Sequence, residues 1–389
     1  MRLAFVSIMA RSSWGASEAL WAQTALRALQ RGHEVLVSVY RWDETPAAIA
    51  ELERAGAHVD LRPRDRWSRR SALLSRLRGA YRTLEKFAPD AICLSQGSTY
   101  DISRGGGISE LRGALRRMQA PYALLCHCEQ AAPNQHRLRR AREAFSQAAV
   151  VGVLAANLRE MSERHLGISL PQARIFHNPV NLKETELLPW PEEKPLRLAF
   201  VGRLEPVKNL PLLIQVLSSS TWLQRHWTLT VCGTGPERKL IEQQSVLWDR
   251  IGGRIRFAGY VRDIAALWAE HHVLVMPSQL EGVPLAMIEA MLCGRPVVAT
   301  NIGGISAWLQ DAQTGFLIEK PTAAALDTAL ERMWVNRAQL QAMGIRAQQL
   351  TKAKRDPDPA GTLQHWLEET ARSVCAASAA SQNRPYQNL

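Results

Sequence analysis

Short apolar runs alternate with longer amphipathic stretches along the whole chain. The apolar runs cover 3–8, 34–39, 91–94, 123–126 and 150–154 in the first half, and 196–201, 228–232, 254–257, 273–276 and 296–299 in the second. Short apolar runs that are each followed by a helical pattern are typical of parallel strands covered by helices on both faces. The pattern therefore predicts an α/β chain with doubly wound parallel sheets.

The run RLAFV occurs twice, at 2–6 and at 197–201, and each copy begins a strand–loop–helix sequence. Two such starts in 389 residues favour two Rossmann-like domains over one large sheet. The segment between them is rich in proline and charge and lacks a helical period. We therefore expect one domain over 1–176, a linker over 177–195, a second domain over 196–371 and a disordered tail over 372–389.

Composition narrows the class of protein. The chain has no long uncharged apolar run, which argues against a membrane-spanning helix, and its N-terminus lacks the cleavage pattern of a signal peptide. Six scattered cysteines fit a reducing cytoplasm. Cys126-His127-Cys128 lacks a second ligand pair for zinc, so packed thiols are the simpler interpretation. The net charge of +12 favours anionic partners without choosing among phosphates, lipids and nucleic acid.

The stretch EGVPLAMIE, 281–289, places a glutamate at each end of an apolar segment. Pro284 fits the first turn of a helix, and the free N–H groups at that helix start form a site for phosphate. Carboxylates accept hydrogen bonds from hydroxyls, so Glu281 and Glu289 fit the two sugars that flank the diphosphate of a nucleotide sugar. An amphipathic helix with a surface glutamate, preceded by a loop glutamate, explains the same spacing.

The stretch GRLEPVKN, 202–209, places Arg203 and Lys208 directly after a predicted strand that ends at Gly202. Two cations there would stabilise a diphosphate leaving group, although an ordinary basic surface loop is the alternative. Ligands of open α/β sheets bind at the carboxyl ends of the strands, so these residues would face a cleft between two domains.

Small residues precede a helical pattern in WGASEALW, 14–21, where they would let a ligand approach the backbone. This stretch lacks the G-x-G-x-x-G spacing, and CGTGPERK, 232–239, has Arg238 where the third glycine is required. The two departures disfavour an NAD-dependent dehydrogenase.

Taken together, these motifs resemble the retaining GT-B glycosyltransferases of group 1, also called family 4. EGVPLAMIEAM is similar to their E-x7-E motif, GRLEPVKN to their phosphate motif, CGTGP to their G-x-G-P segment, GASE to their Gly-Gly-x-Glu loop, and HNPVN to their domain junction. The likeness extends over about 1–319. It implies a GT-B fold, in which 1–176 binds the acceptor and 196–371 binds the nucleotide-sugar donor across a cleft.

The resemblance also implies roles for the matching residues. Arg203 and Lys208 would hold the diphosphate, Glu289 the ribose and Glu281 the hexose, while His127 would contact the donor sugar unless it is a structural histidine. The candidate catalytic residues are Glu281, Arg203, Lys208 and His127. The candidate donor-binding residues are Gly15, Ala16, Gly202, Arg203, Lys208, Gly233, Tyr260, Val261, Glu281, Gly282, Val283, Pro284, Leu285 and Glu289. Ala16 stands where the family has a second glycine, and Val283-Pro284 where Phe-Gly or Phe-Pro is more frequent.

The implied reaction is the retaining transfer of a hexose from a nucleoside-diphosphate sugar to a glycan or lipid-linked acceptor, in the biosynthesis of cell-surface polysaccharide or glycolipid. No Asp-x-Asp motif stands at the site, and the DPD at 356–358 lies near the tail, so we expect no cofactor and no divalent metal. A nucleotide-sugar epimerase or hydrolase, or a noncatalytic binder, is the alternative. Recognisable nucleic-acid-binding motifs are lacking, so nucleic acid is not an expected partner.

A basic amphipathic segment adds one further candidate partner. Arginines stand at 62, 64, 66, 69, 70, 76, 78 and 82, and leucines recur with helical period among them. Together with RLRRAR at 137–142, this segment fits an anionic membrane surface, whereas a solvated helix packed on the sheet is the alternative. We expect a cytoplasmic protein, peripheral on the inner face of the membrane. The sequence leaves the base, the hexose and the acceptor open.

Overall fold

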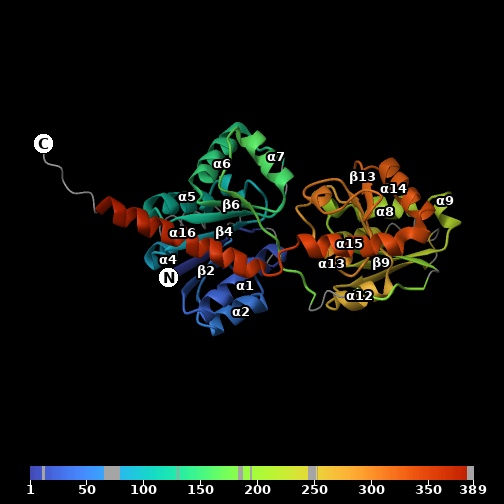
Figure 1. The fold of residues 1–389 in the computed structure, drawn as a ribbon, viewed down its shortest axis with the longest axis horizontal. Coiled ribbons are helices and arrows are strands. Elements are labelled where there is room, and N and C mark those ends of the chain that lie inside the picture. Colours follow the sequence, from blue (N-terminus) through green and yellow to red (C-terminus); the bar gives the residue numbers. More distant parts are fainter. Residues whose placement is uncertain are drawn as a thin grey trace. The chain divides into compact units, whose positions relative to one another are not determined.

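The computed structural model describes residues 1–10, 14–64, 79–128, 131–182, 187–192, 195–243, 251 and 253–382. They form two compact units. Unit 1 contains Met1–Pro179 together with Asp356–Leu389, and unit 2 contains Val180–Arg355. In each unit, helices cover a parallel sheet (Figure 1).

The sheet of unit 1 has seven parallel strands in the order β3-β2-β1-β4-β5-β6-β7. Its strands are β1 (Arg2–Ser7), β2 (Glu34–Tyr40), β3 (His58–Arg62), β4 (Ala91–Gln96), β5 (Tyr122–Cys126), β6 (Val150–Val153) and β7 (Ala173–Ile175). Its helices are α1 (Ala16–Gln30), α2 (Ala47–Arg54), α4 (Arg82–Phe87), α5 (Gly107–Met118), α6 (Gln135–Gln147), α7 (Ala156–Leu166) and α16 (Pro359–Gln382), with a 3₁₀ turn η1 (Asp101–Ser103). The buried strands are almost wholly apolar because helices cover both of their faces.

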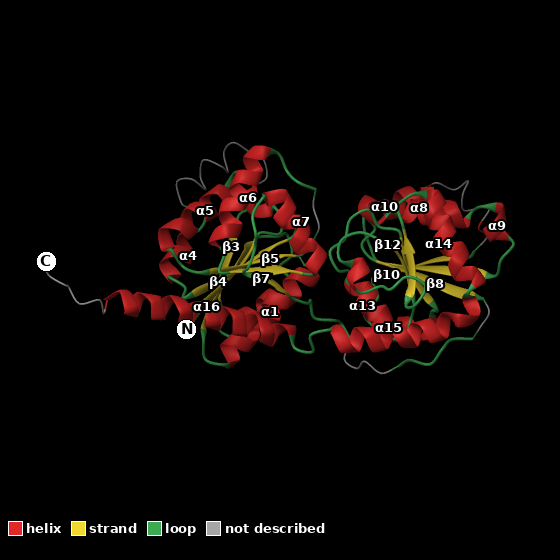
Figure 2. Cartoon of the chain, turned by 45° about the horizontal axis from the view of Figure 1, so that its top comes forward, coloured by secondary structure: helices red, strands yellow, loops and turns green. Residues whose placement is uncertain are grey.

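The sheet of unit 2 has six parallel strands in the order β10-β9-β8-β11-β12-β13. Its strands are β8 (Leu196–Val201), β9 (Trp227–Cys232), β10 (Ile255–Gly259), β11 (Val273–Met276), β12 (Val297–Thr300) and β13 (Gly315–Ile318). Its helices are α8 (Leu210–Leu217), α9 (Ser220–Leu223), α10 (Glu237–Gln243), α12 (Ile264–Glu270), α13 (Leu285–Leu292), α14 (Ala323–Val335) and α15 (Leu340–Lys354), with 3₁₀ turns η2 (Pro206–Lys208), η3 (Ile305–Ala307) and η4 (Arg337–Gln339). Helices α8 and α14 pack on one face, and α13 and α15 on the other (Figure 2). Helix α12 packs in the same core as α13.

The predicted fold class is confirmed, since all ten predicted apolar runs coincide with strands of two parallel sheets. The repeated RLAFV lies in β1 and in β8, the first strand of each unit along the chain. The strand orders reverse between β1 and β4 and between β8 and β11. Loops at the carboxyl ends of strands diverge at such a reversal and leave room for a ligand.

The predicted end of the second domain is corrected by the last helix. Helix α16 packs along α1 in unit 1, where Arg27 forms an ion pair with Asp358 at 2.7 Å (Figure 1). Because α16 belongs to unit 1, the second domain ends at Arg355 and not at 371. The helix continues to Gln382, through the first part of the tail predicted as disordered, and 383–389 lie outside the described residues.

The predicted linker and the basic segment are described only in part. The chain passes from unit 1 to unit 2 after Pro179, within the predicted linker. The predicted amphipathic helix falls largely on 65–78, outside the described residues. RLRRAR lies in α6, which buries Leu138 and Ala141 in the core of unit 1. Within the described ranges, no helix combines the length and the apolarity needed to cross a membrane.

Candidate functional site

In unit 2, the loops that follow β8 and β9 lie in close contact and are joined by backbone hydrogen bonds. The N–H of Gly202 donates to the Cys232 carbonyl at 3.0 Å, and the N–H of Leu204 donates to the Thr234 carbonyl at 2.8 Å. Gly233 has φ +135°, and a Cβ atom there would lie 1.8 Å from the Gly202 carbonyl oxygen. The chain needs glycine at this position because both the backbone angle and the space exclude a side chain.

Lys208 and Glu281 meet at the carboxyl edge of this sheet, although they are 73 positions apart in sequence. The Lys208 Nζ donates to Glu281 Oε1 at 2.6 Å, and both side chains are largely buried. The loops that carry them are joined by a bond from the Gln279 N–H to the Val207 carbonyl, 2.7 Å long. Two residues predicted to bind one ligand therefore already lie together.

Arg203 lies apart from this pair. Its guanidinium forms an ion pair with Glu205 at 3.0 Å, and half of its side chain is exposed. The sequence motif contains Glu205, but the prediction did not assign a partner to Arg203. A diphosphate contact by Arg203 stays a prediction.

The turn that follows Glu281 is supported by a neighbouring loop. The Gly282 carbonyl accepts from the Gly304 N–H at 2.7 Å, and a Cβ at Gly303 would lie 2.3 Å from the Glu281 carbonyl oxygen. Gly303 and Gly304 were not predicted as site residues, although a glycine pair in the loop after a predicted strand is a usable signal.

Helix α13 begins after this turn at Leu285, so Pro284 is its N-cap and lies one position earlier than predicted. Its carbonyl accepts from the Met287 N–H at 3.1 Å. The N–H groups of Leu285 and Ala286 stand in the first turn, where the helix itself offers no acceptor. This arrangement, with Gly282 and Val283 in the preceding turn, retains the capacity to bind an anion.

Glu289, inside α13, is almost completely buried. Its Oε1 accepts from the backbone N–H of Asn181 at 3.0 Å and from the Asn181 side-chain Nδ2 at 2.9 Å. Burial raises the pKa of the Glu289 carboxyl, and the two bonds from Asn181 oppose that rise. Asn181 is the last residue of the HNPVN stretch, and its contact with Glu289 was not predicted.

The resemblance to the GT-B family implies that the backbone near Tyr260 and Val261 faces the base of the donor, and this segment follows β10. Tyr260 is three-quarters exposed and Val261 is half-buried. The carbonyl of Gly259, just before them, accepts from the Gly233 N–H at 2.6 Å. The structure thus brings the Tyr260 backbone next to the glycine loop.

In unit 1, the loop after β1 leads into α1 through Gly15, which precedes the helix in extended conformation. Ala16 is the first helical residue, and its side chain lies outside the described set. Glu18 is buried and accepts from the Ser7 hydroxyl at 3.2 Å and from the Ser17 hydroxyl. Glu18 is the glutamate of the GASE stretch, for which no contact was predicted.

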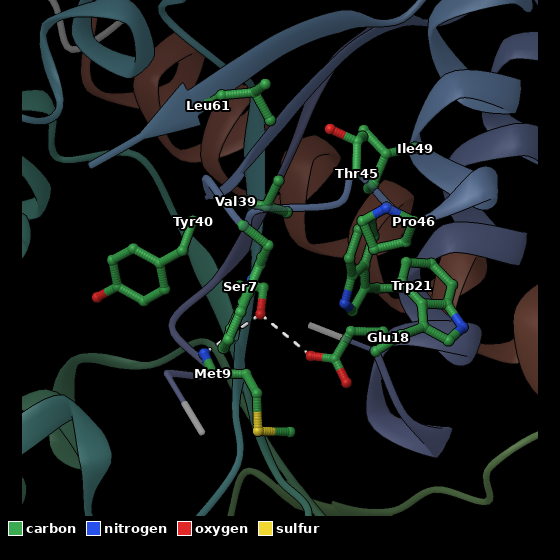
Figure 3. A pocket seen from close by; sticks show the side chains of 12 residues that line it. Ser7, Met9, Glu18, Trp21, Val39, Tyr40, Thr45, Pro46, Ile49 and Leu61 are labelled. Atoms are coloured by element: carbon green, nitrogen blue, oxygen red, sulfur yellow. Dashed lines mark hydrogen bonds between the residues drawn. The ribbon is translucent and has the colours of Figure 1, made fainter. Parts of the chain in front are cut away.

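A small pocket lies beside Glu18 at the carboxyl ends of β1 and β2. Ser7 lies between Met9 and Glu18 there and forms a hydrogen bond with each (Figure 3). The aromatic lining residues are Trp14, Trp21, Tyr40 and Trp42. A carboxylate beside aromatic faces offers both polar and apolar contacts to a ligand.

His127 follows β5 in unit 1. Its Nε2 lies 3.2 Å from the Ser95 hydroxyl, and its ring packs edge-on to Phe176, with 4.9 Å between ring centroids. Burial lowers the pKa of His127 to about 3, so the ring is neutral near pH 7. Among the described residues, its buried Nδ1 has no hydrogen bond of ordinary geometry, although Asn178 lies beside the ring.

The predicted residues therefore gather in two places. Gly202, Lys208, Gly233, Glu281 and the start of α13 share one edge in unit 2, while Gly15 and His127 belong to unit 1. Within the described ranges, no three His, Cys, Asp or Glu side chains are placed to hold a metal ion. Cys126 is buried and its sulfur accepts from Gln96, as expected for a packed thiol.

Comparison with known proteins adds independent information. Residues 195–336 match the family model described as glycosyl transferases group 1. A D-inositol 3-phosphate glycosyltransferase of Salinispora tropica is 32% identical over 148 residues, covering 35% of this chain and 30% of that protein. A glycogen synthase of Mycobacterium tuberculosis is 29% identical over 161 residues, covering 41% and 39%. The chain thus spans about a third of the length of these curated relatives.

Two solved structures share the fold over nearly the whole chain. Anabaena Alr3699/HepE in complex with UDP superposes with a TM-score of 0.73 at 19% identity, covering 96% of this chain and 100% of that one. Sucrose-phosphate synthase from Thermosynechococcus elongatus superposes with a TM-score of 0.71 at 19% identity, covering 97% and 99%. The chain has the two-unit GT-B fold of these proteins.

Proposed function

Residues 195–336 match the family model of group 1 glycosyl transferases, and from this match we propose that the protein is a glycosyltransferase that uses a nucleoside-diphosphate sugar as donor. The observation that carries the proposal is the meeting of Lys208 with Glu281 beside the start of α13. An ammonium group and free helix N–H groups suit a diphosphate, and a carboxylate suits sugar hydroxyls. The neighbours Alr3699/HepE were solved with UDP and with UDP-glucose, which supports a nucleotide-sugar donor here.

Each group would act in one part of the reaction. Lys208, Arg203 and the N–H groups of Leu285 and Ala286 would stabilise the charge that develops on the departing diphosphate. Glu281 would hold hexose hydroxyls and Glu289 the ribose. The diphosphate of the donor would compete with Glu281 for the ammonium group of Lys208. The Glu281 carboxylate would then be free to accept a hydrogen bond from a hexose hydroxyl.

We further propose that the reaction retains the anomeric configuration. Glu281 is bound to Lys208 and Glu289 to Asn181, so neither buried carboxylate is set as a free nucleophile. Retention would follow from attack of the acceptor on the face that the phosphate leaves, with the phosphate taking the acceptor's proton. His127, neutral near pH 7, would serve as a hydrogen-bonding contact to the sugar and not as a cation. The step needs no divalent metal in this proposal.

The acceptor would be a glycan or a lipid-linked sugar, and unit 1 would bind it. The pocket beside Glu18 supports this assignment, because aromatic faces pack on the apolar faces of sugars or lipids and a carboxylate accepts their hydroxyls. Exposed cations on α4 and α6, among them Lys86, Arg139 and Arg142, would favour the anionic inner face of a membrane. Such a location suits the assembly of cell-surface polysaccharide or glycolipid.

The proposal is tested by incubating the protein with labelled UDP- and GDP-sugars. We expect slow hydrolysis of one donor without acceptor, and loss of that hydrolysis in Lys208→Met. Release of an epimerised nucleotide sugar would favour an epimerase, and binding without turnover in the presence of glycan and glycolipid acceptors would favour a noncatalytic binder. Flotation with neutral and anionic vesicles tests the proposed membrane binding. Equal binding to both kinds of vesicle would reject an attraction to anionic lipids.

A further inference from the structure

Asn181 holds the Glu289 carboxylate with two N–H groups that meet the same oxygen. The backbone N–H lies 3.0 Å and the side-chain Nδ2 lies 2.9 Å from Oε1. Two donors from one residue fix both the position of Oε1 and the rotation of the carboxylate about its last bond. The other oxygen, Oε2, has no hydrogen-bond partner among the described residues.

The second oxygen, Oε2, is not among the fully buried atoms that lack a partner, so it is open to a ligand. A buried carboxylate loses hydration and recovers it only through hydrogen bonds. Burial raises the pKa of Glu289, and the only opposing contributions come from Asn181, not from a cation. The nearby Cys293 thiol is neutral because burial raises its pKa to about 12.

We propose that Asn181 is a positioning residue, which orients Glu289 so that Oε2 accepts hydrogen bonds from the ribose hydroxyls of the donor. The inference rests on the proposed function, since it requires a nucleotide at this site. Asn181 acts only through Glu289 and does not touch the donor. A purely structural cap for a buried acid is the competing explanation.

The two explanations differ in what they predict for ribose analogues. A thermal-shift screen of UDP, GDP and ADP first identifies the preferred nucleoside diphosphate. Calorimetry then gives Kd for that nucleotide and for its 2′-deoxy and 3′-deoxy forms. In the wild type, at least one deoxy form should bind about tenfold more weakly, the loss expected for one hydrogen bond to a charged group.

Asn181→Ala removes one of the two donors and should weaken the parent nucleotide about tenfold, while the affinity for that deoxy form stays unchanged. In Asn181→Ala, the parent nucleotide and its deoxy form should therefore bind with nearly equal Kd. Asn336→Ala is the matched control, because its amide also donates to one acceptor, the Arg332 carbonyl at 2.8 Å, at the end of α14. That variant should discriminate as the wild type does.

The outcomes separate the inference from the proposed function. Equal weakening of all three nucleotides by Asn181→Ala, or unchanged discrimination, overturns the positioning role. A wild type that binds none of the diphosphates removes the proposed function, and this inference with it. If Asn181→Ala does not fold, Asn181→Leu, which is similar in volume but has no side-chain donor, is used in its place, and wild-type discrimination there overturns the inference.

Discussion

Lys208 Nζ lies 2.6 Å from Glu281 Oε1, and this contact joins the loop after β8 to the loop after β11. The two charges satisfy each other in a largely buried setting. A buried pair of this kind contributes little net stability, but removing one partner leaves the other charge buried and unpaired. Stability and donor binding should therefore respond differently to single and double substitutions.

Lys208→Met should lower the free energy of unfolding by about 1–3 kcal/mol, because Glu281 is left without its partner. Lys208→Met combined with Glu281→Gln should recover part of that loss, since neither charge remains. Both variants should bind the nucleoside diphosphate at least about tenfold more weakly, because the cation is gone. Urea unfolding and calorimetry measure the two effects.

Arg203→Met is the control for this pair. Arg203 is half exposed and paired with Glu205, and such surface pairs contribute about 0–1 kcal/mol. The free energy of unfolding of Arg203→Met should stay close to that of the wild type. Equal destabilisation by Lys208→Met and by the double variant would contradict the interpretation of Lys208–Glu281 as a buried pair.

Gly233→Ala should destabilise unit 2 by more than about 2 kcal/mol, because strain at φ +135° adds to a clash with the Gly202 carbonyl. Gly253→Ala is the matched control in the same unit. Gly253 has φ +72° but nothing lies within 4 Å of its added Cβ, so only strain of about 1 kcal/mol applies. Thermal unfolding of both variants checks the difference, and identical shifts would show that the two loops separate freely.

His127 should make the stability of unit 1 depend on pH. Its folded-state pKa of about 3 lies below the ordinary value of 6.5, so the unfolded chain binds more protons between these values. Stability is therefore lost as pH falls through 6.5 toward 3, by at most about 1.4 kcal/mol per pH unit. His127→Gln should flatten this dependence in urea unfolding between pH 7 and pH 5, and an unchanged slope would reject a neutral buried ring.

Trp42→Ala should separate acceptor binding from donor binding. Trp42 lines the pocket in unit 1, whereas the proposed donor groups lie in unit 2. Loss of a large aromatic face should raise the KM for the acceptor about tenfold and leave the KM for donor hydrolysis unchanged. Assays over a panel of glycan and glycolipid acceptors provide the measurement, and a parallel rise in both constants would place the pocket outside the acceptor path.

Much of the fold could be predicted because buried parallel strands are apolar on both faces. The edge strands β3, β7 and β13 were missed. HVDLR and ARI mix polar and apolar residues where only one neighbouring strand covers them. GFLI in β13 is apolar, but four residues are too short a run to distinguish a strand from a loop. The unit that α16 covers was also missed, because the apolar face of a helix does not specify which sheet it packs on.

The site was predictable where topology alone brings residues together. Lys208 and Glu281 each follow strands that meet at one edge, so their proximity followed from the motifs. The contacts of Asn181 with Glu289 and of Gly303 with Glu281 depend on loop conformation over long sequence separations, and no local pattern encodes them. The pocket beside Glu18 was missed for the same reason, since α1, β2 and α2 contribute to its walls.

The return of α16 to α1 also has a consequence for synthesis on the ribosome. Unit 1 is interrupted by the whole of unit 2, residues 180–355, and its sheet stays uncovered on the α16 side until that insert has been made. At ordinary elongation rates the delay is on the order of 10 s. The first-made part of the protein is thus the last to be completed, and the nascent chain exposes the apolar flank of α1 throughout that interval.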